Sequence, residues 1–270
     1  DSTVKKIQLY ERLFRLNIKI LSAPGSNVAT GRNLAIGHAK HEVIAVTDAG
    51  CILDREWLNL ITLPFDLHPE TEISAGYYLA RSENPVGRVL GQLLVPKLDK
   101  LDPTRFLPSS RSIAFSRSFW EKVGGYPEFL TLSGEDTLFS IRAKKAASEW
   151  AFVPDAVVLW SPPSSYRELC VKIFRWGKGD GEAGLFPLRY CKVSLAYATL
   201  FALVTAALAC MSTNTLASVF CGVLFLMGWI KLLRKSGVNV RNQDSLRNCF
   251  RTIVGLHIVH ISEVVGYIAG

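Results

Sequence analysis

The spacing of apolar residues changes near residue 190 of this 270-residue chain. Before that point, short runs rich in branched residues alternate with segments of helical periodicity, which is typical of an α/β domain. The run over residues 43–47 is apolar on both faces, so we expect a central strand of a mostly parallel sheet flanked by helices. The pattern predicts strands over residues 18–21, 43–47, 72–78, 112–115 and 151–159, and helices over residues 4–17, 31–39, 56–63, 119–123, 135–147 and 166–176.

Residues 191–270 show the pattern of membrane helices. The 38 residues from 193 to 230 contain no Asp, Glu, Lys, Arg or His, and the polar run 212–215 interrupts them. Two helices of about 19 residues would each rise roughly 28 Å, close to the hydrocarbon thickness of a bilayer. We predict a transmembrane hairpin, because a buried hairpin of a soluble bundle would show a polar stripe on each helix. A third apolar stretch over residues 250–270, which contains Arg251, His257, His260 and Glu263, fits either a third span or an interfacial helix.

Basic residues flank this hairpin at both ends, and its central turn has no charge. Lys192 precedes it, and Lys231, Arg234, Lys235 and Arg241 follow it. Positively charged flanks stay in the cytoplasm, so we expect a multi-pass protein of the inner (plasma) membrane with its catalytic domain cytoplasmic. The chain has 31 Lys and Arg against 23 Asp and Glu, which suits phosphate-bearing ligands or anionic membrane lipid. We predict no nucleic-acid partner, because no nucleic-acid-binding motif accompanies the charge.

Two acidic segments of the α/β part are suited to chemistry. Asp48 ends the apolar strand, where ligands of α/β sheets bind, although an Asp just before Gly50 also suits a simple turn. Glu135 and Asp136 begin a predicted helix, and Asp136 could accept a proton from a substrate hydroxyl. The alternative is an ordinary helix start, with Ser133 as N-cap and two acids in the first turn.

A third segment combines Arg175 and Trp176 with a glycine-rich run over residues 177–181, which we expect to end the helix. Backbone amides and Arg donors there could hold a diphosphate. The alternative is a segment at the level of the lipid headgroups, where Trp and basic residues commonly precede a span. Asp54 is predicted to cap the helix over residues 56–63. The six cysteines show no CxxC pair and no metal-ligand spacing, so no zinc site is predicted.

The order of the motifs resembles the family 2 glycosyltransferases, most closely the non-processive, membrane-associated members with a few helices after a GT-A catalytic domain. The resemblance covers about residues 1–185 and continues into the hairpin. Its specificity comes from five motifs in the family's order. These motifs are GRNLAI at 31–36, TDAGC at 47–51 with WL at 57–58, the segment 116–126 that ends in Gly-Gly-Tyr, GED at 134–136 and KIFRW at 172–176.

The resemblance implies a GT-A fold and a direct displacement that inverts the anomeric centre of a nucleotide-diphosphate sugar. It also implies a metal site at the family's DxD motif, here Asp48, Ala49 and Gly50. The positions that match the family's site residues are Asp136 as catalytic base, Arg32, Asn33 and Asp48 at the donor, and Glu135, Arg175 and Trp176 at the acceptor or the diphosphate.

The sequence departs from the family pattern at two positions and at its start. Gly50 stands where a second metal-binding carboxylate is often found, which leaves Asp48 as the expected ligand for Mg²⁺ or Mn²⁺. Lys172 occupies the first position of the Q/RxxRW motif, which argues against processive polysaccharide synthesis. Residues 1–3 resemble the tail of the family's first loop, so we expect the first two strands of the domain to be missing from the chain.

The sequence therefore predicts an inverting glycosyltransferase, with an N-terminally incomplete GT-A-like domain over residues 1–190 and a membrane region over residues 191–270. Its donor would be a nucleotide-diphosphate sugar, and its acceptor a lipid-linked or other saccharide at the cytoplasmic membrane face. A non-catalytic nucleotide-sugar-binding membrane protein is the alternative, favoured by the missing second carboxylate. A transporter subunit is disfavoured, because the hairpin carries no charge where a substrate path would need one.

Overall fold

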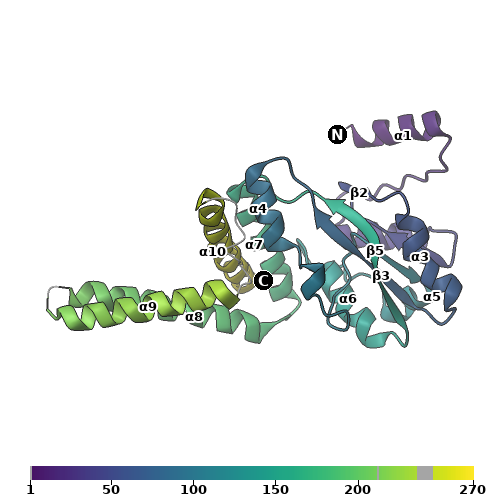
Figure 1. Cartoon of the computed structure of the whole chain (residues 1–270). Helices are drawn as coiled ribbons and strands as arrows, with labels where there is room; N and C mark the ends of the chain where they lie inside the picture. The colour runs from purple at the N-terminus through teal and green to yellow at the C-terminus, as the bar shows by residue number, and fades with distance from the viewer. Residues whose placement is uncertain (1, 212, 236–245) are drawn as a thin grey trace.

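A five-stranded mixed sheet forms the centre of the α/β part of the chain (Figure 1). The structure is a computed structural model that describes residues 2–211, 213–235 and 246–270. The strands lie in the order β1-β4-β3-β5-β2. They are β1 (Val43–Val46), β2 (Cys51–Leu53), β3 (Ile73–Ala80), β4 (Ile113–Ser116) and β5 (Trp150–Trp160).

The prediction of a mostly parallel sheet is wrong, because β3 and β5 form the one parallel pair among the described strands. Strand β4 pairs antiparallel with both β1 and β3, and β2 pairs antiparallel with β5. Strand β1 also lies at one end of the strand order, not at its centre. Apolar residues on both faces of a strand indicate cover by helices on both sides, and they carry no information about the direction of the neighbouring strand.

The predicted strand over residues 18–21 is also wrong. Residues 16–23 have no regular structure, and Ile20 is 37% exposed. A strand is stabilised by hydrogen bonds to a neighbour, and no described strand pairs with this segment. Sequence reasoning missed β2, which has three residues, and the helix that covers residues 85–94.

Helices cover both faces of the sheet. On one face Phe115, Phe119 and Tyr126 belong to a buried cluster, and on the other Trp57 and Ile61 pack against β5. The predicted helices of this part are confirmed with shifted ends, and the first of them buries no residue and lies apart from the sheet (Figure 1). The helices are α1 (Thr3–Phe14), α2 (Val28–Gly37), α3 (Trp57–Leu67), α4 (Pro85–Leu94), α5 (Arg117–Val123), α6 (Glu135–Ala146) and α7 (Tyr166–Glu182), with a 3-10 turn at Leu98–Lys100.

Two predicted N-caps differ from the structure. Helix α6 begins after Gly134, whose φ of +93° places it in the left-handed region, and no side chain caps it, so Ser133 is not its N-cap. Glycine is needed there, because the backbone of Gly179 approaches closely. Asp54 lies two residues before Glu56, which is the N-cap of α3, and its carboxylate accepts a hydrogen bond from the Glu56 amide at 3.0 Å.

The glycine-rich run over residues 177–181 does not end α7, as the sequence predicted, but lies inside it. A Cβ on Gly177 would overlap the backbone of Glu263, and one on Gly179 would overlap the backbone of Ser133. These glycines therefore permit close approach of neighbouring segments, and they do not form a loop around a diphosphate. A glycine run predicts flexibility only where no neighbour presses on it.

The C-terminal helices are α8 (Pro187–Cys210), α9 (Thr215–Lys235) and α10 (Leu246–Ala269). Helices α8 and α9 form the predicted hairpin, which extends away from the sheet, while α10 lies against α7 and α4 (Figure 1). All three helices are long and apolar enough to cross a membrane. Two polar residues of α10 have partners on α8: His257 Nδ1 lies 2.6 Å from the Tyr197 hydroxyl, and Glu263 pairs with Arg189 at 2.7 Å. Of the basic flank, Arg241 and the side chains of Arg234 and Lys235 lie outside the described residues.

Candidate functional site

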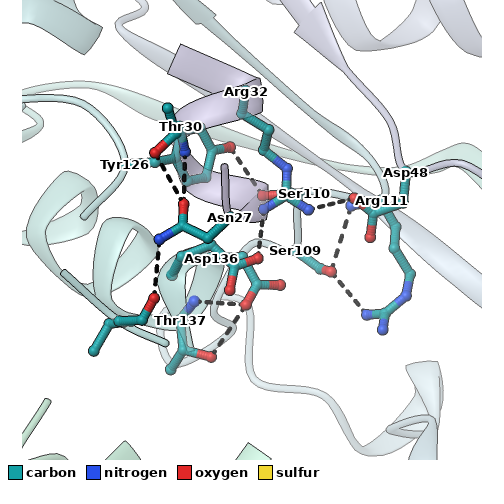
Figure 2. Close-up of polar contacts among 12 residues, drawn as sticks. Asn27, Thr30, Arg32, Asp48, Ser109, Ser110, Arg111, Tyr126, Asp136 and Thr137 are labelled. Carbon is teal, nitrogen blue, oxygen red and sulfur yellow. Dashed lines mark hydrogen bonds and ion pairs between the residues drawn. The ribbon is translucent and has the colours of Figure 1, made fainter. Parts of the chain in front are cut away.

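Arg32 joins two segments that lie far apart in the sequence. It stands on α2, and its guanidinium donates to Asp48 Oδ1 and to Glu135 Oε1, both at 2.5 Å (Figure 2). One side chain therefore ties the end of β1 to the start of α6 through charge-assisted hydrogen bonds. Burial opposes the charge of Arg32, but the attraction of Asp48 and Glu135 outweighs burial and raises the pKa of the guanidinium.

Asn33 fixes the segment that leads to α6. Its side-chain amide donates to the Tyr126 carbonyl at 2.8 Å and to Glu128 Oε1 at 2.7 Å, and its oxygen accepts from the Tyr126 amide at 2.9 Å. These bonds use both amide hydrogens, so the structure gives Asn33 a positioning role. Its contact with the donor stays a prediction.

Asp48 lies at the end of β1 in a turn that continues into β2. Its carbonyl accepts from the Cys51 amide, and Gly50 takes a φ of +86° within the turn. The carboxylate is 28% exposed, and its Oδ2 has no partner among the described residues. Asp48 can therefore offer one oxygen to a metal, which fits a site shared with phosphate and water. Within the described part of the chain, no group of three His, Cys, Asp or Glu side chains could hold a metal alone.

Glu135 and Asp136 are placed side by side at the start of α6, whose N-terminus favours negative charge. Burial, followed by the charge of Asp136, raises the pKa of Glu135, and Arg32 offsets only part of this effect. Asp136 Oδ1 accepts from the Thr137 amide at 2.8 Å, while its Oδ2 has no partner among the residues described (Figure 2). That free oxygen is the one available to accept a proton.

Arg32, Asp48 and Glu135 form what we call the Arg32 bridge, and no hydrogen bond or ion pair among the described residues joins Arg175 and Trp176 to it. Arg175 and Trp176 line a cavity of about 680 Å³ together with Lys172 and Ser133, which lies three residues before Asp136. The cavity therefore connects the end of the KIFRW motif with the loop that precedes the acids of α6. Its other lining residues are Leu132, Ser165, Arg167, Glu168 and Val171.

Sequence reasoning missed Arg111, which lies just before β4. Its guanidinium carbon is 4.9 Å from the ring centre of Tyr78 and 4.8 Å from that of Trp160. Lys172 Nζ lies 4.6 Å from the same Trp160 ring. The sequence around Arg111 reads Ser-Ser-Arg-Ser and gave no local signal, because its aromatic partners come from β3 and β5.

A larger cavity of about 1050 Å³ lies beside α4, and none of the predicted site residues lines it. Tyr77, Arg88 and Lys97 are among the residues around it. Of the predicted site residues, Arg175 and Trp176 line the smaller cavity, and the acids and Arg32 line neither of the two.

Comparison with known proteins bears on the fold. No protein-family model and no curated protein matches the chain. Among solved structures, the mannosyltransferase PcManGT from Pyrobaculum calidifontis, in complex with GDP-Man and Mn²⁺, is similar with a TM-score of 0.61 and 15% identity, over 99% of this chain and 74% of that chain. TarS 1-349 of S. aureus gives a TM-score of 0.47 and 13% identity with UDP-GlcNAc bound, over 99% of this chain and 77% of that chain.

TarS 1-349 with UDP gives a TM-score of 0.46 and 18% identity, over 66% of this chain and 52% of that chain, so the match spans about half of that protein. At such identities a similarity concerns the fold, and PcManGT is the one of these structures with a TM-score above 0.5. The chain has a GT-A-like fold similar to that of PcManGT, with a mixed sheet in place of the mostly parallel sheet that was predicted.

Proposed function

We propose that the protein is an inverting glycosyltransferase that moves a sugar from a nucleotide-diphosphate donor to a lipid-linked or saccharide acceptor at the cytoplasmic membrane face. The observation that carries this proposal is the Arg32 bridge in a GT-A-like fold. The bridge holds Asp48 close to Glu135, and Asp136 is the next residue after Glu135. The mannosyltransferase of similar fold was solved with GDP-Man, which supports a nucleotide sugar as ligand.

In the proposed reaction the acceptor hydroxyl attacks C1 of the sugar, and the bond between C1 and the diphosphate oxygen breaks. Asp136 takes the hydroxyl proton through its free oxygen, as a general base. The electron pair leaves with the nucleoside diphosphate, whose added negative charge nearby cations stabilise. Asp48 faces the donor and would supply one oxygen ligand to Mg²⁺ or Mn²⁺, which polarises the diphosphate when bound.

The cavity that contains Arg175 and Trp176 is the proposed entry for the acceptor. Its wall includes Ser133, so an acceptor hydroxyl there would approach the loop just before Asp136. The proposed catalytic domain covers residues 1–190 and the proposed membrane region covers residues 191–270, with both ends of the hairpin in the cytoplasm. A membrane-bound acceptor suits this arrangement, since three apolar helices follow the α/β part.

The test is transfer and donor hydrolysis by the full-length protein in detergent, with a panel of nucleotide sugars. We expect turnover of one donor, and Asp136→Asn should lower the rate by about a hundredfold or more while donor affinity stays within a few-fold. Asp66→Asn, which changes an exposed acid of α3, is the matched control. Wild-type turnover by a folded Asp136→Asn protein would contradict the assignment of the base.

A non-catalytic nucleotide-sugar-binding protein is the second candidate. The glycine at position 50 favours it, because the DxD motif then lacks its second carboxylate. The same assay separates the two functions. Donor binding in the panel, with neither hydrolysis nor transfer to any acceptor, would support the binding protein.

A further inference from the structure

Three cations surround the Asp48 turn, and two of them have no acidic partner. Arg32 is paired with Asp48 and Glu135. Arg111 and Lys172 form no ion pair with any residue that the structure describes. The charge of Asp48 acts on Lys172, but Arg32 already binds one oxygen of the Asp48 carboxylate. Arg111 and Lys172 therefore carry charge that no ion pair with a described residue neutralises.

The two cations are held in place by aromatic rings. Arg111 contacts Tyr78 and Trp160, and Lys172 contacts Trp160 and, at 5.8 Å, Trp176. Rings attract cations through their faces, but they cancel no charge. Contacts of this kind orient a cation and leave its hydrogen-bond donors available to a ligand.

The hydrogen bonds of Arg111 point to the same conclusion. Its Nη1 donates to Ser109 Oγ at 2.9 Å, as Figure 2 shows. Its Nε is buried without a partner, and its Nη2 also has none among the described residues. A buried donor without a partner costs folding free energy, so a guanidinium in this state is not placed for stability alone. Anions such as phosphate are the usual ligands of such a guanidinium.

The charges of Arg111 and Lys172 also oppose each other. Burial, followed by the charge of Arg111, lowers the pKa of Lys172, while Asp48 acts in the opposite direction. Strand β2 pairs with β5 so that Cys51, which lies three residues after Asp48, stands opposite Trp160. This pairing brings Trp160, and with it the two cations that contact its ring, close to the Asp48 turn. An anion bound at this place would relieve the repulsion.

We propose that Arg111 and Lys172, held against Trp160, form the anion site that receives the diphosphate of the donor and stabilises it as the leaving group. This assignment rests on the proposed function and deepens it, since it names the residues that accept the charge released when the C1–oxygen bond breaks. The site supplements the single carboxylate of Asp48 with two protein cations.

The test uses inorganic pyrophosphate as probe, titrated calorimetrically into the full-length protein in detergent with excess chelator. We expect Arg111→Gln and Lys172→Gln each to weaken pyrophosphate binding by about tenfold or more, because each removes charge-assisted hydrogen bonds. Arg105→Gln and Lys178→Gln are matched controls that should bind pyrophosphate like wild type. The first removes a surface Arg of the same loop and the second a Lys of the same helix, and each has a nearby acid partner.

Thermal unfolding identifies any variant that fails to fold. Arg111→Lys keeps the charge and serves in place of Arg111→Gln if needed, with an intermediate affinity expected. Wild-type pyrophosphate affinity in folded Arg111→Gln and Lys172→Gln would overturn the site. Turnover of a nucleotide sugar with unchanged KM in both variants would overturn it too and leave the proposed function standing. Pyrophosphate binding that both variants lose, without turnover of any donor by wild type, would support the site and contradict the function.

Discussion

Replacement of Gly177 by alanine tests how closely α7 and α10 are packed. In an exposed helix this change would stabilise the protein by about 1 kcal/mol, because glycine is a poor helix former. Here the added Cβ would overlap the carbonyl oxygen of Glu263 and approach its Cα at 3.0 Å. Backbone atoms of a helix cannot rotate away as a side-chain end can, so α10 itself must move.

The size of the effect follows from this geometry. Restoring an ordinary contact requires α10 to shift from α7 by roughly 1 Å. Overpacking of this kind costs about 1 to 3 kcal/mol, against the gain of about 1 kcal/mol in helix propensity. The net loss of up to about 2 kcal/mol corresponds to a decrease in Tm of up to roughly 4 to 8 °C for a chain of this size. Activity should also fall, because α7 carries Lys172 and Arg175.

The assay is thermal unfolding of the full-length protein in detergent, followed by tryptophan fluorescence. Gly31→Ala is the matched control, since Gly31 lies inside α2 and a Cβ there meets no atom within 4 Å. We expect Gly177→Ala to lower Tm and Gly31→Ala to raise it. An increase of Tm in both variants would refute the close packing of α7 against α10.

Two further predictions concern charge and topology. Burial and the charge of Asp136 raise the pKa of Glu135 above the ordinary 4.5, so the native state binds the proton more strongly than the unfolded state does. Relative to Glu135→Gln, the Tm of wild type should therefore fall as pH rises from 4.5 to the raised pKa, and then stay level. A Tm difference that changes with pH in the opposite direction would contradict this prediction. For the hairpin, a cysteine introduced by Asn214→Cys in a Cys210→Ser background should react with an impermeant reagent from outside the cell, and labelling only after lysis would overturn the predicted topology.

The apolar pattern located most elements and failed where neighbours decide the structure. Residues 43–47 formed a strand, but the antiparallel return of β4 set its direction and its place in the sheet. Residues 18–21 had the composition of a strand and stayed irregular, because no described strand lies beside them. The run over residues 177–181 was composed like a loop and became helix, because α10 and the backbone of Ser133 leave space for hydrogen atoms only. In each case the missing information was the position of a distant segment.

The site was predictable to the extent that motif order identified its residues. The sequence selected Arg32, Asp48 and Glu135, and the structure joins them through hydrogen bonds that span 16 and 103 residues of sequence. No local pattern could show that Arg32 bridges the other two. Arg111 was missed for the same reason, since its aromatic partners Tyr78 and Trp160 lie on strands far from it in sequence.

Helix α7 lies between the C-terminal helix α10 and the loop that precedes the proposed catalytic base. Residues four apart in a helix share a face, and Gly177 and Gly181 both meet the backbone of α10, at Glu263 and Tyr267. Residues seven apart also share a face, so Lys172 and Gly179 lie on the same face of α7. Gly179 packs against the backbone of Ser133, just before α6. Glu182 accepts a hydrogen bond from the Thr131 amide at 2.7 Å and holds the same loop. Because side chains are absent at both contacts, the backbone of α7 packs directly against α10 on one face and against the loop just before Asp136 on another.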